Sequence, residues 1–162
     1  MKIWGVLALV KPKDLWSLTK LLLRFPLFAI PTIKATAKCI RICNRLFGNE
    51  HHNNNATNAF RHALWNFLII IESKGWTTKD DKALLWSKLI TDWHEEFSPN
   101  KDLARAMDLH NNQVGRNLFI ENTTINTEEG IKQLKTMIQN SAKVHTEEEL
   151  LKYTNRLVHL KD

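Results

Sequence analysis

The sequence predicts a single all-α domain, folded as a compact bundle of about six to seven helices. The chain has 162 residues, which is enough for one domain with its own core. Hydrophobic residues make up 43% of the chain and only five residues are glycine, a composition typical of a globular helical protein. Apolar residues recur at spacings of three and four throughout, whereas the alternating pattern of β-strands is scarce.

Prolines, glycines and capping residues set the expected helix boundaries. The first helix should stop at Pro26, and the second should begin after Pro31, with Thr32 as its cap, and end at Gly48. Ser98, followed by a proline, is a typical start for a fifth helix. The expected helices are, in order, about 13–25, 32–48, 55–73, 78–97, 98–118, 127–140 and 146–160.

Two of these starts carry the spacing of a capping box. Thr78 followed by Asp81 suggests the start of the fourth helix, and Thr146 followed by Glu149 suggests the start of the seventh. The chain then divides into three parts: basic amphipathic helices in 1–50, a helical core in 51–120, and C-terminal helices in 121–162 that pack on this core.

The positive charge of the chain is concentrated in its N-terminal third. Residues 1–50 carry a net charge of +7 within a total of +6. Four cations fall at i, i+4, i+7 and i+11 along one face of the second helix, opposite an apolar face that includes Ile33 and Ile40: Lys34, Lys38, Arg41 and Arg45. Such a helix suits an anionic membrane surface, although its apolar face could instead join the core. Specific nucleic-acid binding is not expected.

The sequence favours a cytoplasmic protein or one bound peripherally at a membrane. The apolar stretch 3–10 is too short to span a bilayer and lacks the cleavage site of a signal peptide. Cys39 and Cys43 lie four residues apart on a predicted helix, which indicates two buried thiols rather than a disulfide and so a reducing compartment.

The segment NAFRHALWN, residues 58–66, contains polar residues in an otherwise apolar helix. Asn58, His62 and Asn66 lie within about 80° of one another on a helical wheel, opposite a side that includes Phe67 and Leu68. Amides, an imidazole and small neighbouring alanines differ from the Lys and Glu typical of a solvent face. We therefore expect a buried polar patch whose members find partners on other helices.

Two further helices each present a histidine that could reach this patch. His94 borders the apolar face of the fourth helix, and His110 lies within that of the fifth. If the imidazoles of His62, His94 and His110 converge, they could hold a metal such as zinc or share acid and base roles, with Asp108 or Glu95 nearby. Alternatively, each histidine is a structural core residue. On the helical wheel, Glu95 projects away from the apolar face.

The strings NAFRHALWN, DWHEE and MDLHNNQVGR together resemble a family of uncharacterised bacterial domains with an RHA, HE and MDxHNNxxGR signature. The resemblance covers about residues 51–117. It implies a helical domain, some of whose members form part of secreted, toxin-like proteins, and it implies no agreed activity.

These observations predict a small helical hydrolase acting on a phosphate-containing substrate, a phospholipid or a phosphodiester. The alternatives are a membrane-surface or partner-binding module with a structural polar cluster, and a toxin-like effector domain. The expected catalytic residues are His62, His94, His110, Asp108 and Glu95. Those expected to position substrate or bind its anion are Asn58, Arg61, Asn66, Asn111, Asn112 and Arg116. No cofactor follows from the sequence beyond the zinc that the histidines could hold.

Overall fold

The computed structural model describes residues 12–97 and 101–161, and this part of the chain is an all-α single domain with one short parallel strand pair. Its elements are, in chain order, α2 (Pro12–Arg24), η1 (Pro26–Phe28), α3 (Ala29–Phe47), η2 (Glu50–His52), α4 (Ala56–Lys74), α5 (Asp80–Phe97), α6 (Asp102–Glu121), α7 (Thr127–Gln139), β1 (Ala142–Lys143), α8 (Glu147–Leu150) and β2 (Val158–His159).

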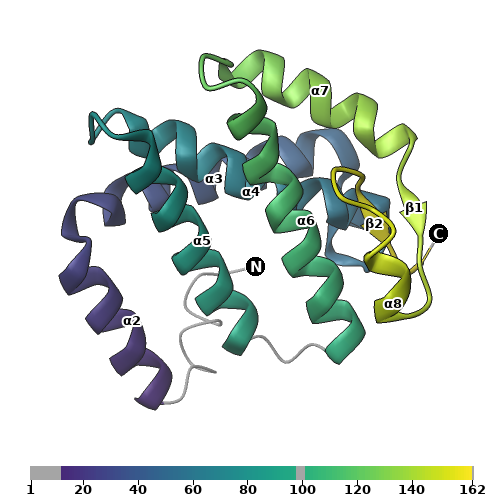
Figure 1. Ribbon diagram of the computed structural model, residues 1–162, viewed down its shortest axis with the longest axis horizontal. Helices are drawn as coiled ribbons and strands as arrows, with labels where there is room; N and C mark the ends of the chain where they lie inside the picture. The colour runs from purple at the N-terminus through teal and green to yellow at the C-terminus, as the bar shows by residue number, and fades with distance from the viewer. Residues whose placement is uncertain (1–11, 98–100, 162) are drawn as a thin grey trace.

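Helix α4 is the centre of the domain. It contacts α3, α5, α6 and α7, and Figure 1 shows α5 and α6 side by side in front of it. Asn55 caps its first turn by accepting hydrogen bonds from the backbone N–H groups of Thr57 and Asn58. The helix is apolar on most sides, and a run of its large side chains is fully buried: Phe60, Leu64, Phe67, Leu68, Ile69 and Ile70.

A glycine allows α4 and α6 to approach closely. An added Cβ at Gly115 of α6 would lie 2.0 Å from the carbonyl oxygen of Ala63 on α4, so any larger residue would force the helices apart. This contact brings the polar residues of the two helices within hydrogen-bonding distance.

Three buried or half-buried tryptophans on α4 and α5 form hydrogen bonds to the N-terminal helices α2 and α3. The indole N–H groups of Trp65, Trp86 and Trp93 each donate to a hydroxyl group on α2 or α3. Their acceptors are Thr36, Thr32 and Ser17, respectively. A buried indole needs such a partner, and these bonds fix how the two helices lie against the core.

The second helix begins earlier than the sequence predicted. Helix α3 starts at Ala29, and Pro31 lies inside its first turn, where the missing N–H has no intrahelical partner to lose. Thr32 is therefore not its cap. The fourth helix begins at Asp80, slightly later than Thr78, whereas the expected third and sixth helices are confirmed within a residue. The expected start at Ser98 and Pro99 lies outside the described residues, as does the apolar stretch 3–10.

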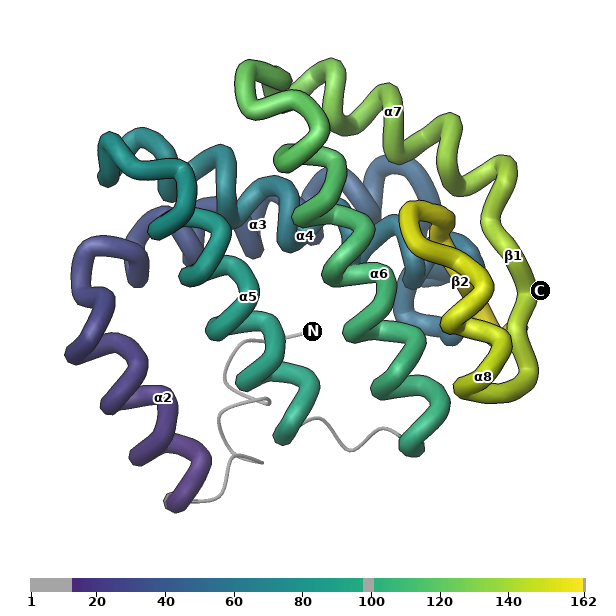
Figure 2. Tube along the Cα trace, in the orientation of Figure 1, coloured from purple at the N-terminus to yellow at the C-terminus, as the bar shows by residue number. Residues whose placement is uncertain are grey.

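The expected seventh helix over 146–160 is wrong. Only Glu147–Leu150 is helical, and Val158–His159 instead pairs in parallel with Ala142–Lys143. The side chain of Asn111 on α6 explains the difference, because it accepts from the backbone N–H of Val158 and donates to its carbonyl. The paths of the chain in Figure 2 show this C-terminal segment lying along α6.

Candidate functional site

The candidate site is a buried polar cluster assembled from three helices, each with side chains four residues apart. Helix α4 contributes His62 and Asn66, and α6 contributes Asp108, Asn112 and Arg116. Helix α5 contributes Ser87, Thr91 and Glu95. All eight residues are buried. Because a spacing of four keeps side chains on one helical face, each helix presents one polar row to the other two.

His62 is the centre of the cluster and has a carboxylate beside each ring nitrogen. Its Nδ1 lies 3.2 Å from Oε1 of Glu95, and its Nε2 lies 3.2 Å from Oδ1 of Asp108. The guanidinium of Arg61 reaches Nε2 from the other side, with Nη2 at 2.9 Å. The imidazole ring is therefore contacted by charged groups from all three helices.

The contact with Arg61 sets the tautomer of His62. A guanidinium can only donate, so Nε2 must accept and the ring proton must sit on Nδ1. From there it is donated to Glu95, with Oδ1 of Asn112 sharing the bond at 3.3 Å. Nε2 thus faces a donor, Arg61, and an acceptor, Asp108. When Nε2 takes up a proton, the resulting imidazolium has a carboxylate on each nitrogen.

Glu95 is ionised in this setting. Burial raises the pKa of its carboxyl, but the hydrogen bond and charge of His62, the charge of His94 and the hydrogen bond from Asn112 together hold the pKa below its usual value. Oε1 accepts from Nδ2 of Asn112, whereas Oε2 is buried without a hydrogen-bond partner. One carboxylate oxygen of Glu95 thus remains available to a ligand or a proton. The helical wheel predicted the opposite, because it placed Glu95 on the outer face.

A network of hydrogen-bonded amides and hydroxyls holds the side chains of the cluster in place. Nδ2 of Asn66 donates to Oδ1 of Asn112 at 2.7 Å, and Oδ1 of Asn66 accepts from Arg116 at 2.8 Å. The same oxygen accepts from the hydroxyls of Ser87 and Thr91. Asn66 therefore connects all three helices, and its bonds hold Asn112 against Glu95 and His62.

Arg116 belongs to this supporting network. It is 5% exposed, and its guanidinium also donates twice to Oε1 of Gln113. Burial lowers its pKa, with the charge of Asp92 opposing the shift. The sequence suggested that Arg116 binds a substrate anion, but these neutral partners hold it in the core and leave Arg61 as the half-buried cation next to His62.

The structure does not bring the three imidazoles together. His94 lies one residue away from the polar row of α5, and its ring stacks edge-on against Trp65 at 5.1 Å. His110 lies two residues beyond Asp108, on another face of α6, and its Nε2 contacts the carbonyl of Arg156 at 2.8 Å. Within the described residues, His62, His94 and His110 do not together offer three ligand atoms within 4.8 Å of one another.

A different set could hold a metal. Within 12–97 and 101–161, the side chains that offer three ligand atoms within 4.8 Å of one another are His62, Glu95 and Asp108. Imidazole and carboxylates are the ligands that zinc and other divalent cations accept in catalytic sites. The donor set fits, but a cation at Nε2 would have to displace the Arg61 guanidinium that now occupies this lone pair.

The remaining predicted substrate residues lie at the edges of the cluster or outside it. Asn58 is buried and donates to the carbonyl of His51, whereas Asn111 is occupied by the backbone of Val158. Sequence reasoning missed Ser87 and Thr91. The signal was present, because with Glu95 they repeat the four-residue spacing of Asn58, His62 and Asn66.

The predicted basic face of α3 lies at the surface, and two isoleucines that were expected to be on the opposite side are exposed as well. Lys34, Arg41 and Arg45 are exposed, and Lys38 forms an ion pair with Glu72 at 3.0 Å. Ile33 and Ile40, which were expected on the opposite side, are 68% and 45% exposed. No helix in the described residues has the length and apolar character needed to cross a membrane.

A family profile described as Domain of unknown function (DUF6973) matches residues 19–142, which is more than half of the chain. The chain belongs to this family. The DUF6973 match extends beyond residues 51–117 on both sides, so it takes in the C-terminal end of α2, all of α3 and α7, and every residue of the polar cluster. No curated protein and no solved structure matches the chain.

Proposed function

We propose that this domain is a small hydrolase of phosphate esters in which His62 is the general base. The observation that carries the proposal is the buried carboxylate beside each nitrogen of the His62 ring. A lone structural histidine needs one hydrogen-bond partner, whereas this ring has an orienting acceptor on Nδ1 and a second acceptor ready for a proton on Nε2.

The proposed reaction uses groups of this chain alone. Nε2 of His62 takes a proton from water as the water oxygen attacks phosphorus, and the bond from phosphorus to the leaving oxygen breaks. The imidazolium donates to Glu95 through Nδ1 and to Asp108 through Nε2, and it then returns the proton to the leaving oxygen. Arg61 is half-buried beside Nε2 and is the cation placed to bind the phosphate oxygens.

Access to Nε2 depends on Arg61. His62 is 3% exposed, and the Arg61 guanidinium extends from Nε2 to Nδ1 of the exposed His52 at 3.3 Å. A phosphate group that pairs with Arg61 from the solvent side would draw the guanidinium away from Nε2 and leave the lone pair free. Binding of the substrate would then also free Nε2 of His62 from the Arg61 guanidinium.

The test is to incubate the protein with a panel of phosphomonoesters, phosphodiesters and phospholipids and to measure the phosphate or alcohol that is released. We expect turnover of at least one class, and a loss of about 100-fold to 10,000-fold in kcat for His62→Gln. His110→Gln is the matched control, because this imidazole lies outside the cluster and should leave kcat unchanged. Equal activity of wild type and folded His62→Gln, or no turnover by wild type, would reject the proposal.

The implied occurrence of relatives in secreted, toxin-like proteins is compatible with such an activity. A hydrolase domain of this size could act as a secreted effector or as an enzyme inside the cell that produces it. The activity panel tests the proposed reaction in both cases.

A further inference from the structure

The solvent-facing side of α2, η1 and α3 has an unusual amount of exposed apolar surface. Most of the large apolar side chains that are exposed in the described residues lie in this quarter of the chain: Leu15, Trp16, Leu23, Leu27, Ile30, Ile33 and Ile40. Four of them are at least half exposed and run from the end of α2 across η1 into α3: Leu23, Leu27, Ile30 and Ile33. Soluble proteins seldom leave such a group uncovered without a partner.

On α3 the apolar residues form a straight row. Ile30, Ile33, Ala37 and Ile40 are exposed and are spaced by three, four and three residues, so they share one helical face. The neighbouring face carries the exposed cations Lys34, Arg41 and Arg45. An apolar row next to a cationic row, both open to solvent, is the pattern of a helix that lies in a lipid interface.

Helix α2 repeats this arrangement. Trp16 and Leu23, seven residues apart, are 61% and 75% exposed, and Lys13, Lys20 and Arg24 lie on the adjoining face. The ammonium of Lys20 lies 5.3 Å from the centre of the Trp16 ring. Tryptophan and lysine side by side are typical of the boundary between acyl chains and headgroups.

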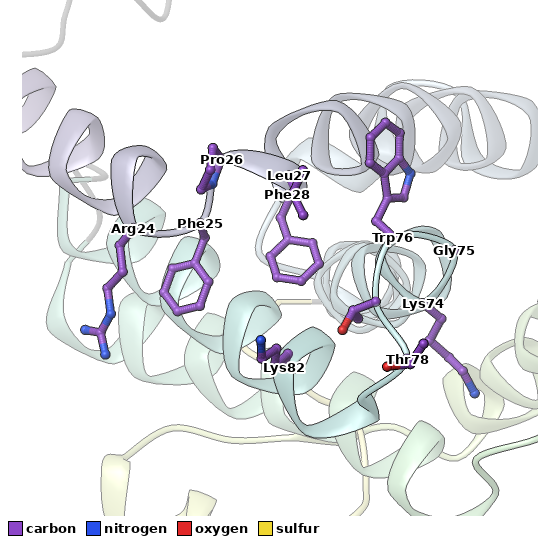
Figure 3. A pocket seen from close by; sticks show the side chains of 11 residues that line it. Arg24, Phe25, Pro26, Leu27, Phe28, Lys74, Gly75, Trp76, Thr78 and Lys82 are labelled. Atoms are coloured by element: carbon purple, nitrogen blue, oxygen red, sulfur yellow. The ribbon is translucent and has the colours of Figure 1, made fainter.

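Two hollows adjoin this surface. One, of about 680 Å³, is lined by Arg24, Leu27, Trp76 and Lys82 among others (Figure 3), and its third cation, Lys74, is already paired with Asp80. The second, of about 250 Å³, is lined mainly by apolar and aromatic side chains that include Ile33 and Trp93, with His94 among them. The first offers cations to a phosphate, and the second offers apolar walls.

We propose that the face formed by α2, η1 and α3 docks on the surface of an anionic phospholipid membrane. The occupant follows from charge complementarity. The exposed cations beside the apolar rows are Lys13, Lys20, Arg24, Lys34, Arg41 and Arg45, and the described exposed residues of α2 and α3 include no carboxylate. A second copy of this chain would bring like charges together, whereas anionic headgroups neutralise them.

The test is co-sedimentation of the full chain with vesicles of phosphatidylglycerol, with phosphatidylcholine vesicles as the neutral comparison. Wild type should bind the anionic vesicles and bind the neutral ones at least about 100-fold more weakly. Ile33→Ser with Ile40→Ser, and separately Lys34→Glu with Arg41→Glu and Arg45→Glu, should each reduce binding by about 30-fold or more.

Matched controls carry the same changes elsewhere on the surface. Ile120→Ser with Leu151→Ser removes exposed apolar residues outside the face. Lys132→Glu with Lys135→Glu and Lys152→Glu reverses three exposed charges on α7 and just after α8. These variants should bind as wild type does. Absence of binding, equal binding to neutral vesicles, or equal losses in face and control variants would overturn the proposal. So would a wild-type dimer in sedimentation that Ile33→Ser with Ile40→Ser converts to monomer.

Discussion

Gly115 of α6 lies directly on the backbone of Ala63 in α4, and a Cβ at position 115 would come within 2.0 Å of the Ala63 carbonyl oxygen. The carbonyl cannot move aside as a flexible side chain can. We expect Gly115→Ala to separate the helices and to destabilise the fold by about 3 kcal/mol or more, despite alanine's better helix propensity. Urea denaturation measures this.

Gly75 provides the comparison for that prediction. At Gly75 an added Cβ would have its nearest neighbour, a backbone oxygen, at 3.6 Å, which is an ordinary contact. Gly75→Ala should change the free energy of unfolding by less than about 1 kcal/mol. Equal effects of the two substitutions would mean that the close approach of α4 and α6 does not constrain the site.

Asn66 should be the polar side chain that the fold tolerates losing least. Asn66→Ala leaves the Arg116 guanidinium and the hydroxyls of Ser87 and Thr91 without their shared acceptor in a buried site. We expect a loss of about 3 to 5 kcal/mol in the free energy of unfolding. Asn53→Ala, which removes an exposed amide that donates to Glu50, should cost less than about 1 kcal/mol. A small effect at Asn66 would show that the network does not bind the helices together.

The fold and part of the site could be predicted because they follow from periodicity within single helices. The buried row of Asn58, His62 and Asn66 was visible as polar residues that share one face of an otherwise apolar helix. The same reasoning placed Asp108 and Asn112 further round α6 from His110, but it did not show that both meet His62.

The partners of His62 were harder to predict, because they lie on other helices and a helical wheel describes one helix at a time. On α5 the repeating row is Ser87, Thr91 and Glu95, and His94 falls about 100° away from it. The apolar pattern alone placed Glu95 away from the apolar face, since it cannot show that His62 on α4 and Asn112 on α6 lie within reach of its carboxylate. The C-terminal strand was missed for a similar reason, because its partners are β1 and the distant Asn111.

Arg61 should separate substrate binding from the chemical step. On the phosphate ester that the activity panel identifies, Arg61→Ala should lower kcat/KM by about 100-fold, because one charged contact to phosphate is lost. Arg61→Lys keeps the charge and loses the two-pronged geometry, so its kcat/KM should fall between those of wild type and Arg61→Ala. An unchanged kcat/KM in Arg61→Ala would remove Arg61 from the proposed site.

Metal content distinguishes acid–base chemistry from metal-assisted chemistry at the same residues. Because Arg61 donates to Nε2 of His62, we expect wild type purified without chelator to hold substoichiometric zinc and to keep its activity in EDTA. Arg61→Ala frees Nε2 beside Glu95 and Asp108, so this variant should bind divalent zinc more tightly. Elemental analysis measures the zinc content of wild type and of Arg61→Ala. Stoichiometric zinc in wild type that Asp108→Asn abolishes would make His62 a ligand instead of the base.

Acid should weaken the fold through histidines that are buried in their neutral form. Burial, with the charges of His52 and Arg61, lowers the pKa of His51 from 6.5 to about 4, and its Nε2 donates to Asn44 Oδ1 at 2.7 Å. Between these values the unfolded chain binds a proton that the folded chain does not bind, so the free energy of unfolding falls as pH drops from about 6.5 to 4. Burial also lowers the pKa of His94 and His110, which acts in the same direction. Urea denaturation of wild type and His51→Gln at pH 7.5 and pH 5 measures the effect: the variant should lose less stability on acidification, and equal losses would contradict the assignment to His51.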